Sequence, residues 1–356
     1  MNARLERKLR LLAAIIVGSV IGAICFVLAR GFISPAGIEV GVLYGLLLSV
    51  AIGGISQFVL EGPMRGWLRS LSFTASLISR SAIYAAIIIP ILFFQLGEVL
   101  AGIPVDPLHK GFWISIAYSV AFVILANLVI GTANIIGPRA FLNFITGRYH
   151  SPVEEDRFVL FVDIAGSTGL AERLGGVAIH RLLDRTFRLL TLAVVDYRGE
   201  VLDYVGDEVI VTWRERDGAV DCRPLRCFAA MRHELAGASD QFERELGAVP
   251  RIRGSLHFGP VIVGEIGDVK RAIVFNGDVM NTAARLEELS RTVDGGFLAS
   301  RTAMERFGSA PPFAIRDLGR LPIRGRVDGI DVVGIDDRNG SRESMPARRK
   351  VYDQGR

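Results

Sequence analysis

The sequence predicts two parts of different fold class: a membrane all-α bundle of four helices and, after it, a cytoplasmic α+β domain. Three observations predict this arrangement. Half of the 356 residues are hydrophobic, and the mean hydropathy of +0.38 is high for a protein that lies wholly in water. The long apolar stretches all end before residue 137. After that point, segments typical of strands alternate with segments typical of helices.

The membrane part is predicted from four apolar stretches that contain no Lys or Arg. They are Leu11–Ala29, Val40–Leu60, Ala82–Leu100 and Phe112–Ile136. Each has about 19–25 residues, enough for a helix to cross about 30 Å of hydrocarbon. Because backbone amides find no water inside a bilayer, we expect all four to be helical. Gly18 and Gly22, like Gly41 and Gly45, are spaced for close helix packing, although glycine is also generally common in membrane helices.

Basic residues in the short connections predict the orientation of these helices. One side of the membrane would carry Arg4, Arg7, Lys8, Arg10, Arg65, Arg69, Arg80, Arg139 and Arg148. The other side would carry only Arg30 and Lys110. The positive-inside rule therefore predicts a multi-pass protein of the inner (plasma) membrane, surrounded by lipid, with both termini in the cytoplasm. A signal peptide is a poorer interpretation of the first stretch, which is unusually long for one and is followed by three more.

Charge and cysteine content exclude several classes of protein. The net charge is only +4, and the basic residues flank apolar stretches, so we expect no nucleic-acid partner. The three cysteines, Cys25, Cys222 and Cys227, include no C-x-x-C spacing. A secreted disulfide framework and a zinc site of the usual pattern are therefore excluded.

Composition also predicts the domain boundaries. We expect a transmembrane domain of four helices at 1–137, a coupling linker at 138–157, the α+β domain at 158–335 and a disordered tail at 336–356. The linker begins at Pro138 and has the pattern of a short helix, a turn and the approach to a strand. The tail is polar and poor in apolar residues, which favours disorder.

The α+β domain is expected to open with a strand at Phe158–Asp163. A helix should follow, with Ser167 or Thr168 as its N-cap, and run to about Leu192. Gly199–Trp213 has the pattern of a hairpin that turns at Gly206-Asp207. The remaining predicted elements are a helix over about Arg223–Leu246, a strand pair Ile252–His257 and Val261–Glu265 around Gly259-Pro260, a helix capped by Asp278, and strands near Ala314–Leu318 and Ile330–Ile335.

Two aspartates are candidate metal ligands. Asp163 closes the first strand and Asp207 lies at the hairpin tip, and a rigid backbone at such positions can hold a carboxylate outward. Two acids of this kind, brought together, are hard oxygen ligands that suit Mg²⁺ or Mn²⁺. Each acid taken alone also fits an ordinary turn residue.

A small-residue loop follows the first of these acids. The loop Ile164–Thr168 contains Gly166 and Ser167 and leads directly into a helix. Backbone amides in such a loop can bind an anion. The same pattern also fits a plain helix cap.

Two further pairs suit sugar and phosphate. Asn281 and Arg285 are four residues apart and share one helix face, so an amide and a guanidinium lie side by side. Arg253 begins a strand, and Arg324 lies in the loop Pro322–Arg326. Each of these side chains equally fits a solvated surface position.

Taken together, these segments resemble one family, the class III nucleotidyl cyclases. The matching motifs, in order, are FVDIAGST, YVGDEV, IRGSLHFGPVIVGEIG, FNGDVMNTAARLE and a late IRG. The resemblance covers roughly Phe158–Ile335, and the order and spacing of five motifs make it specific. The linker segment TGRYHSPVEEDR also looks like the coupling segment of bacterial membrane-anchored cyclases. The resemblance implies a ferredoxin-like palm that works as a homodimer, with active sites in the groove between the two copies.

The resemblance also implies a reaction and its ligands. Asp163, Asp207 and the carbonyl of Ile164 would hold two Mg²⁺ or Mn²⁺ ions per active site. The ribose 3′-oxygen of a nucleoside triphosphate would attack the α-phosphate, which releases pyrophosphate and leaves a 3′,5′-cyclic nucleotide. Asn281 would orient the ribose and Arg285 would stabilise the α-phosphoryl charge, both from the partner chain.

The remaining implied roles concern phosphate. Arg253 and Arg324 match basic residues that contact the phosphates in this family. Gly166, Ser167 and Thr168 belong to the loop that is predicted to bind the nucleotide. Together these residues imply a complete set of groups for metal, ribose and phosphate.

The choice of base stays open. Where many adenylate cyclases have Lys and Asp or Thr, this chain has Asp203 and Val274. Asp203 can accept but not donate a hydrogen bond, and guanine offers donors at N1 and N2. We favour ATP, and thus a membrane-bound adenylate cyclase for intracellular signalling, because bacterial homologues of this build are mostly adenylate cyclases. The alternatives are a guanylate cyclase and a non-catalytic nucleotide-binding signalling protein.

Overall fold

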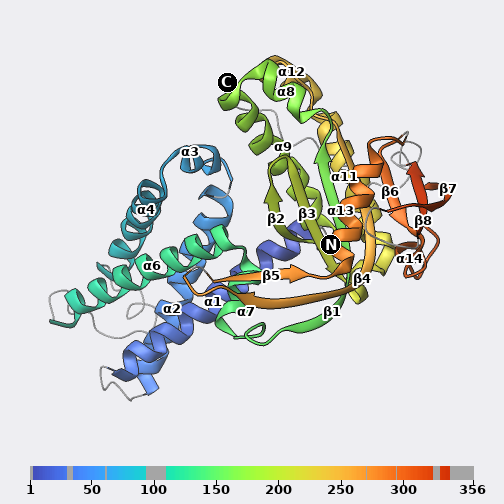
Figure 1. Ribbon diagram of the computed structural model, residues 1–356. Coiled ribbons are helices and arrows are strands. Elements are labelled where there is room, and N and C mark those ends of the chain that lie inside the picture. Colours follow the sequence, from blue (N-terminus) through green and yellow to red (C-terminus); the bar gives the residue numbers. More distant parts are fainter. Residues whose placement is uncertain are drawn as a thin grey trace. The chain divides into compact units, whose positions relative to one another are not determined.

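The computed structural model describes residues 3–29, 35–60, 62–93, 110–269, 271–293, 295–323 and 329–336. The chain divides into two compact units, Met1–Phe141 and Leu142–Arg356, and each is described by itself (Figure 1). The predicted tail lies outside the described residues from residue 337 onward.

The described part of the first unit is built of helices. They are α1 (Ala3–Ala29), α2 (Pro35–Ile55) with a π-helical continuation (Ser56–Leu60), α3 (Arg65–Ser70), α4 (Phe73–Phe93), α6 (Lys110–Ile136) and the start of α7 (Pro138–Ile145). Three of these helices are long and apolar enough to cross a membrane, and their spans are Ile38–Ile55, Phe73–Phe93 and Ile116–Ala133. α1 holds a shorter apolar segment, Ile15–Cys25. The first predicted span, Leu11–Ala29, therefore stays a prediction.

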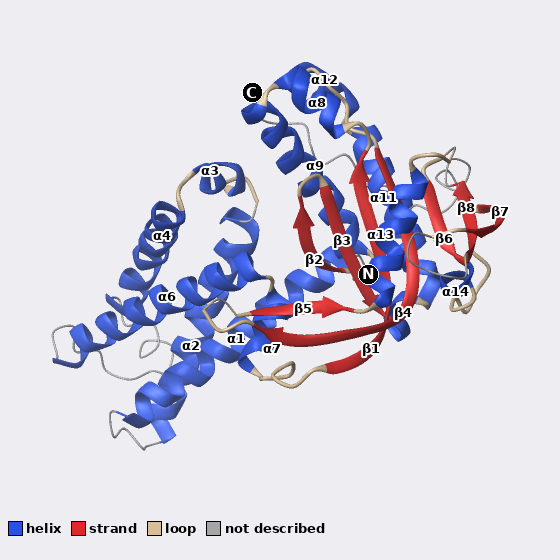
Figure 2. Cartoon of the chain, viewed as in Figure 1, coloured by secondary structure: helices blue, strands red, loops and turns tan. Residues whose placement is uncertain are grey.

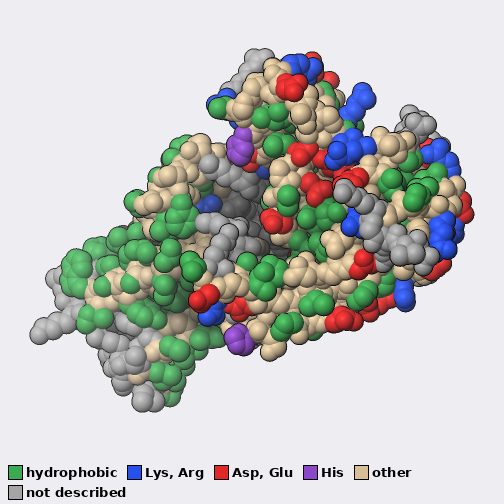
Figure 3. Space-filling view, viewed as in Figure 1, with side chains coloured by type: hydrophobic (Ala, Val, Ile, Leu, Met, Phe, Trp, Pro, Cys, Tyr) green, Lys and Arg blue, Asp and Glu red, His purple; other side chains and the backbone are tan. Residues whose placement is uncertain are grey.

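The surface of this unit is apolar. Hydrophobic side chains cover much of its described helices (Figure 3). Ile78 and Trp113, for example, are 63% and 67% exposed. An exposed apolar patch of this size would be unfavourable in water, whereas it suits contact with lipid.

The third predicted span is misplaced. The sequence places it at Ala82–Leu100, but α4 begins at Phe73, and residues 94–100 lie outside the described residues. Arg80 is thus inside this helix, so the prediction of spans without basic residues is wrong here. Polar residues can form the first turns of a helix just as apolar residues can. A search for apolar stretches therefore misses the polar start of α4.

Small residues let α1 and α2 pack closely. Gly45, Ser49 and Gly53 recur every fourth residue on one face of α2, and all three are buried. A Cβ atom at Gly45 would lie 2.7 Å from the Cα atom of Val20 in α1. Only glycine permits so close a backbone approach. The packing role predicted for Gly45 is confirmed, whereas Gly18 has no heavy atom within 4 Å of its Cβ position.

The described residues of the second unit form one mixed, eight-stranded sheet with helices on both faces. The strand order is β2-β3-β1-β4-β6-β8-β7, and β5 pairs with the outer half of β4. The strands are β1 (Val153–Ile164), β2 (Glu200–Val205), β3 (Glu208–Arg214), β4 (Ile252–Ile266), β5 (Ala272–Asn276), β6 (Phe297–Ser300), β7 (Ala314–Leu321) and β8 (Ile330–Asp336). Figure 2 shows the long, curved β1 and β4 running together.

The helices of this unit connect those strands. They are α8 (Ser167–Leu174), α9 (Gly176–Asp196), α10 (Glu215–Gly218), a 3-10 turn (Val220–Cys222), α11 (Arg223–Gly237), α12 (Ser239–Leu246), α13 (Asp278–Ser290) and α14 (Arg301–Met304). Alternation along β1 assigns them to two faces. Phe158, Leu160 and Val162 pack with α9 and α11, whereas Val159 and Phe161 pack with α13 on the other face.

The predicted α+β class is confirmed, but two strand assignments are wrong. β1 begins at Val153 and not at Phe158, because its polar first residues pair with the outer half of β4. These residues are largely exposed, so they lack the apolar pattern of a buried strand. The segments around Gly259-Pro260 are one continuous strand and not a hairpin. Pro260 lies between the stretches of β4 that pair with β6 and β5, so its missing N–H costs no ladder hydrogen bond there.

Two predicted helices are each interrupted. The helix after β1 is divided into α8 and α9 at Gly175, which has a φ of 81° that favours glycine. The helix predicted over Arg223–Leu246 is divided into α11 and α12 at Ala238. The short strands β5 and β6 are additions to the prediction, since their pairing with β4 rather than their own sequence makes them strands.

Candidate active site

The pairing of β1 with β3 brings the two candidate metal ligands together. Asp163 stands opposite Glu208, and Asp207 is the turn residue just before Glu208. Gly206 has a φ of 63°, which the tight turn requires, and the Ile164 N–H donates to the Asp207 carbonyl oxygen at 3.3 Å. The carboxyl groups of Asp163 and Asp207 lie close enough for each to shift the pKa of the other. The fold thus places the two acids side by side, while their role as metal ligands stays a prediction.

The contact between the two acids affects their ionisation. Burial, the hydrogen bond with Asp207 and the nearby Glu287 together raise the pKa of Asp163 to about 7, although Arg253 opposes this. For Asp207, burial acts upward, but hydrogen bonds with Asp163 and Ser167 outweigh it and lower its pKa. Proximity therefore separates the pKa values of the two carboxyl groups, and the higher value belongs to the more buried Asp163.

Arginine side chains are the counter-ions of this acidic group. The Nε and Nη2 atoms of Arg253 donate to Asp163 Oδ2 at 3.0 and 2.7 Å. On α13, Glu287 is only 3% exposed, and its Oε1 lies 3.4 Å from Arg253 Nε. Arg291 donates to Glu287 Oε2 at 3.3 Å and lies 3.8 Å from Asp163. Arg253, predicted to contact phosphate, is thus bound to an acid of its own chain.

Glu208, Glu287 and Arg291 are members of this site that sequence reasoning missed. Burial and the neighbouring acids Glu287, Asp163 and Asp207 raise the pKa of Glu208 to about 8. One signal was available for Glu287. The buried positions Val279, Ala283 and Leu286 of α13 place Glu287 on the same buried face. A charged residue on a buried face requires a charged partner.

The donor set fits a divalent cation. Two carboxylates in contact raise each other's free energy, and a cation between them would offset that repulsion. Among the described residues, no group of three or more His, Cys, Asp and Glu side chains is arranged to hold a metal ion. Mg²⁺ is commonly held by one or two carboxylates together with substrate phosphates. The pair therefore suits a metal that arrives with a phosphate ligand.

The loop after β1 differs from its predicted form. Gly166, with a φ of 71°, is the N-cap residue of α8, so the predicted cap role of Ser167 or Thr168 is wrong. The Ser167 side chain instead acts on Asp207 and helps to lower the pKa of that acid, and Thr168 is exposed. The first amides of a helix have no partners within it. They are thus suited to bind phosphate beside the acid pair.

Asn281 and Arg285 lie on α13 but on a different face from Glu287. Asn281 is exposed and Arg285 is partly exposed. At 3.6 residues per turn, Arg285 and Glu287 point about 160° apart around the helix. Asn281 lies about 120° from Glu287 around the same helix, so both side chains point in other directions than Glu287, which faces Arg253. Gly277 is the N-cap of α13, so Asp278, predicted as the cap, is its first helical residue.

Two of the other predicted site residues, Asp203 and Val274, lie on β2 and β5. Asp203 is exposed on β2, and its Oδ1 accepts a hydrogen bond from the Tyr204 N–H at 2.8 Å. Val274 is partly buried on β5, opposite Gly264 of β4. Arg324 lies outside the described residues.

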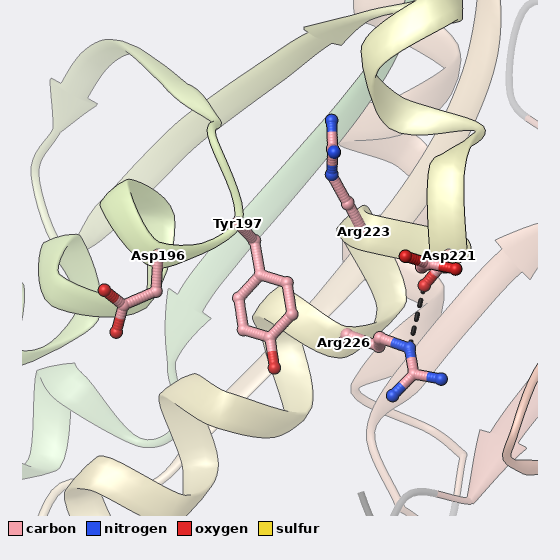
Figure 4. Close-up of a pocket in the computed structure, with 5 residues that line it drawn as sticks. All are labelled: Asp196, Tyr197, Asp221, Arg223 and Arg226. Carbon is pink, nitrogen blue, oxygen red and sulfur yellow. Dashed lines mark hydrogen bonds between the residues drawn. The ribbon is translucent and has the colours of Figure 1, made fainter. Parts of the chain in front are cut away.

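A pocket of about 440 Å³ lies elsewhere in the second unit (Figure 4). It is lined by Asp196, Tyr197, Asp221, Arg223 and Arg226. Arg226 Nε donates to the Asp221 carbonyl oxygen at 2.8 Å, and Arg223 is held by the Asp217 carbonyl oxygen. Two acids and two arginines balance the charge of the lining, so the pocket favours neither anions nor cations. Trp213 Nε1 donates to the carbonyl oxygen of the lining residue Tyr197 at 2.9 Å, so the pocket lies near Trp213 of β3, which pairs with Phe158 of β1.

Comparison with known proteins identifies the second unit. Residues 151–333 match the family described as the adenylate and guanylate cyclase catalytic domain. The chain is 36% identical over 209 residues to adenylate cyclase 2 of Rhizobium meliloti (strain 1021), which covers 58% of this chain and 57% of that protein. It is 25% identical over 183 residues to an adenylate cyclase of Anabaena cylindrica, covering 50% of this chain and 36% of that protein. The chain thus spans about half the length, or less, of these curated relatives.

A solved structure supports the same assignment of fold. The structure of a bacterial light-regulated adenylyl cyclase aligns with a TM-score of 0.55 and 20% identity, over 63% of this chain and 65% of that one. At this identity the likeness concerns the fold alone. The sequence match over residues 151–333, on a mixed sheet with two adjoining acids at one end, shows that the chain belongs to the adenylate and guanylate cyclase catalytic domain family.

Proposed function

We propose that this chain is a membrane-bound adenylate cyclase that converts ATP to 3′,5′-cyclic AMP and pyrophosphate. It would act as a homodimer with two Mg²⁺ or Mn²⁺ ions in each active site. The observation that carries the proposal is the contact between Asp163 and Asp207. Two relatives that are named adenylate cyclases support ATP as the substrate.

The acid pair and its surroundings would divide the work of the reaction. Divalent cations held by Asp163, Asp207 and the Ile164 carbonyl would lower the pKa of the ribose 3′-hydroxyl and offset triphosphate charge. The hydroxyl proton is released to water, and the 3′-oxygen forms a bond to the α-phosphorus. The bond from that phosphorus to the bridging oxygen breaks, and pyrophosphate leaves with the electron pair. The amides of Ser167 and Thr168 would bind the phosphates.

Groups from a second copy would complete the site. Arg285 would stabilise the charge that develops on the α-phosphoryl oxygens, and Asn281 would orient the ribose. Their spacing from Glu287 on α13, about 120° for Asn281 and about 160° for Arg285 around the helix, supports a role toward a second chain. The exposed position of Asn281 leaves it accessible to another chain. We therefore infer that each site combines the acids of one chain with the α13 face of the other.

Guanylate cyclase activity is the second candidate, and the residues at the base positions favour it. Asp203 is exposed and carries only acceptors, which fits the N1 and N2 donors of guanine. Val274 contributes no polar group to either base. Against these two residues stand the names of the relatives, so we place ATP first.

The first unit would anchor the enzyme in the inner membrane, with both termini in the cytoplasm. Three apolar helices of sufficient length and an apolar surface support this part of the proposal. After cell lysis, the full chain should sediment with membranes and enter solution with detergent but not with alkaline carbonate. Extraction by carbonate would contradict the membrane anchor.

The decisive assay uses the purified full-length chain in detergent with Mn²⁺ and either ATP or GTP. We expect cyclic AMP and pyrophosphate in equal amounts, and more cyclic AMP from ATP than cyclic GMP from GTP. Asp207→Asn should abolish product. Asp217→Asn, which alters an exposed acid outside the site, is the matched control and should keep the activity. Mostly cyclic GMP would support the guanylate alternative, and nucleotide binding without product would support the non-catalytic alternative.

Subunit complementation tests the shared site. Asp163→Ala and Arg285→Ala chains should each be inactive alone, because each lacks a different half of every site. Mixed and refolded together, they should regain about a quarter of the wild-type rate, since half of the dimers then contain one intact site. A mixture as inactive as its components would contradict the homodimeric site.

A further inference from the structure

Arg253 lies between two buried carboxylates, ion-paired with both but hydrogen-bonded to only one of them. Its Nε and Nη2 both donate to a single oxygen, Asp163 Oδ2, at 3.0 and 2.7 Å. The two-oxygen fork typical of strong arginine–carboxylate pairs is therefore not formed. The same Nε lies 3.4 Å from Glu287 Oε1. A small rotation of the guanidinium would transfer its hydrogen bond from one acid to the other.

Glu287 offers an open acceptor for that transfer. Its Oε1 is buried and accepts no hydrogen bond within the described part of the chain. Its Oε2 is already bound to Arg291, at 3.3 Å. A buried acceptor without a hydrogen bond typically costs about 1–3 kcal/mol. The site thus contains one guanidinium, one acid that accepts its hydrogen bonds, and a second acid whose nearby Oε1 accepts none of them.

We propose that Arg253 is an exchangeable counter-ion, bound to Asp163 when the metal site is free and transferred to Glu287 when a divalent cation occupies Asp163. Glu287 is then a positioning residue that receives Arg253. This inference rests on the proposed role of Asp163 and Asp207 as metal ligands. The guanidinium offsets the charge of the acid pair before the cation arrives, and Glu287 satisfies the guanidinium afterwards.

The exchange also explains why the resemblance and the structure give Arg253 different ligands. The sequence resemblance implies a phosphate-side arginine, whereas the structure shows one that is bound to an acid. Once Nε is bound to Glu287, the terminal amino groups of Arg253 no longer face Asp163. They become available to a phosphate oxygen that accompanies the metal. Metal binding and phosphate binding are thereby coupled through one side chain.

Mn²⁺ binding to the full-length chain in detergent, without nucleotide, tests the exchange independently of turnover. The readout is the electron paramagnetic resonance signal of unbound Mn²⁺. Arg253→Met removes the competitor for Asp163 and should tighten Mn²⁺ binding about tenfold. Glu287→Gln removes the receiving charge and should weaken Mn²⁺ binding about tenfold. In the double variant, the effect of Glu287→Gln should fall below about twofold, because no arginine is left to receive.

Controls separate this exchange from simple electrostatics. Arg291→Met removes a neighbouring charge that is 53% exposed, and should tighten Mn²⁺ binding less than threefold. Arg253→Lys keeps the charge without the fork of donors and should give an Mn²⁺ affinity between those of the wild type and Arg253→Met. If the Arg253→Met chain does not melt cooperatively in EDTA, Arg253→Lys takes its place in the comparison.

Three results would overturn the exchange. They are weaker or unchanged Mn²⁺ binding in Arg253→Met, unchanged Mn²⁺ binding in Glu287→Gln, and an effect of Glu287→Gln that is equally large with and without Arg253. If the wild-type chain bound Mn²⁺ neither alone nor together with a non-reactive ATP analogue, the metal assignment in the proposed function would fall as well. A wild-type chain that binds Mn²⁺ and produces cyclic AMP, with no change of affinity in these variants, would overturn the exchange alone.

Discussion

Two arginine–carboxylate networks lie at opposite ends of β1, and they differ in how well they are satisfied. Arg157 is 1% exposed, and it donates to Glu155 at 2.7 and 2.9 Å, to Glu200 at 3.2 Å and to the Tyr149 hydroxyl at 3.3 Å. In the other network, Arg253 gives two donors to one oxygen of Asp163. The buried Glu287 Oε1 beside it accepts no hydrogen bond among the described residues.

The pKa shifts of the acids in the two networks have opposite directions. Burial acts to raise the pKa of Glu155, but hydrogen bonding and charge from Arg157 and Arg214 outweigh it and lower the pKa. At the other end, burial and the neighbouring acids raise the pKa of Asp163 to about 7. A network with enough positive charge stabilises the fold, whereas a network short of positive charge is suited to accept a cation.

Asp163→Asn should have the largest effect and should separate the two networks most clearly. We expect a loss of cyclase activity of at least about 10³-fold, because the substitution removes a group that acts on the reacting charge. The thermal midpoint without metal should stay equal or rise, since the repulsion with Asp207 is gone. Retention of activity, or a large fall in the midpoint, would make this acid a structural residue like Glu155.

Arg157→Met should have the next largest effect, on stability. Removal of a buried arginine leaves Glu155 with only the more exposed Arg148 and Arg214 as counter-ions, and loss of one partner of a buried ion pair typically costs about 3–5 kcal/mol. Urea unfolding of the full chain in detergent measures this, with Arg253→Met as the matched control. The control should cost less, because Asp163 can take up a proton in place of its arginine. Equal costs for the two variants would remove the distinction between the networks.

Part of this comparison is visible in the sequence and part is not. Asp163 and Asp207 can be predicted because a strand end and a Gly-Asp turn are local patterns that fix where each acid points. Glu287, Arg291 and Glu208 join the site through contacts across the sheet, which no local pattern contains. The same reason applies to β5, which is a strand because β4 pairs with it. The boundary between α8 and α9 at Gly175 can be predicted from the sequence, since two adjacent glycines favour a helix end.

Glu155→Gln tests the direction of the pKa shift of Glu155. The ordinary pKa of Glu155 is 4.5 and the folded protein lowers it, so ionised Glu155 stabilises the fold above that pH. We expect the variant to be about 2 kcal/mol less stable at pH 7, the scale of a hydrogen bond to a charged group. The difference should shrink as the pH falls below 4.5. Thermal melting at a series of pH values measures it, and a difference independent of pH would assign the effect to packing.

Asp184→Asn provides the smallest expected effect and a reference point. Asp184 and Arg188 form an ion pair one turn apart on α9, with side chains that are 48% and 50% exposed. Water and salt screen such a pair, so the free energy of unfolding should change by less than about 0.5 kcal/mol. A change as large as that of Glu155→Gln would show that burial does not set the difference between the networks.

The most direct test is the position of Mn²⁺ in crystals of the chain grown with Mn²⁺ and a non-reactive ATP analogue. An anomalous difference map should show manganese bound by both Asp163 and Asp207, with the Arg253 guanidinium hydrogen-bonded to Glu287. Manganese bound away from these two acids, with Arg253 still on Asp163, would contradict the metal site and the exchange together.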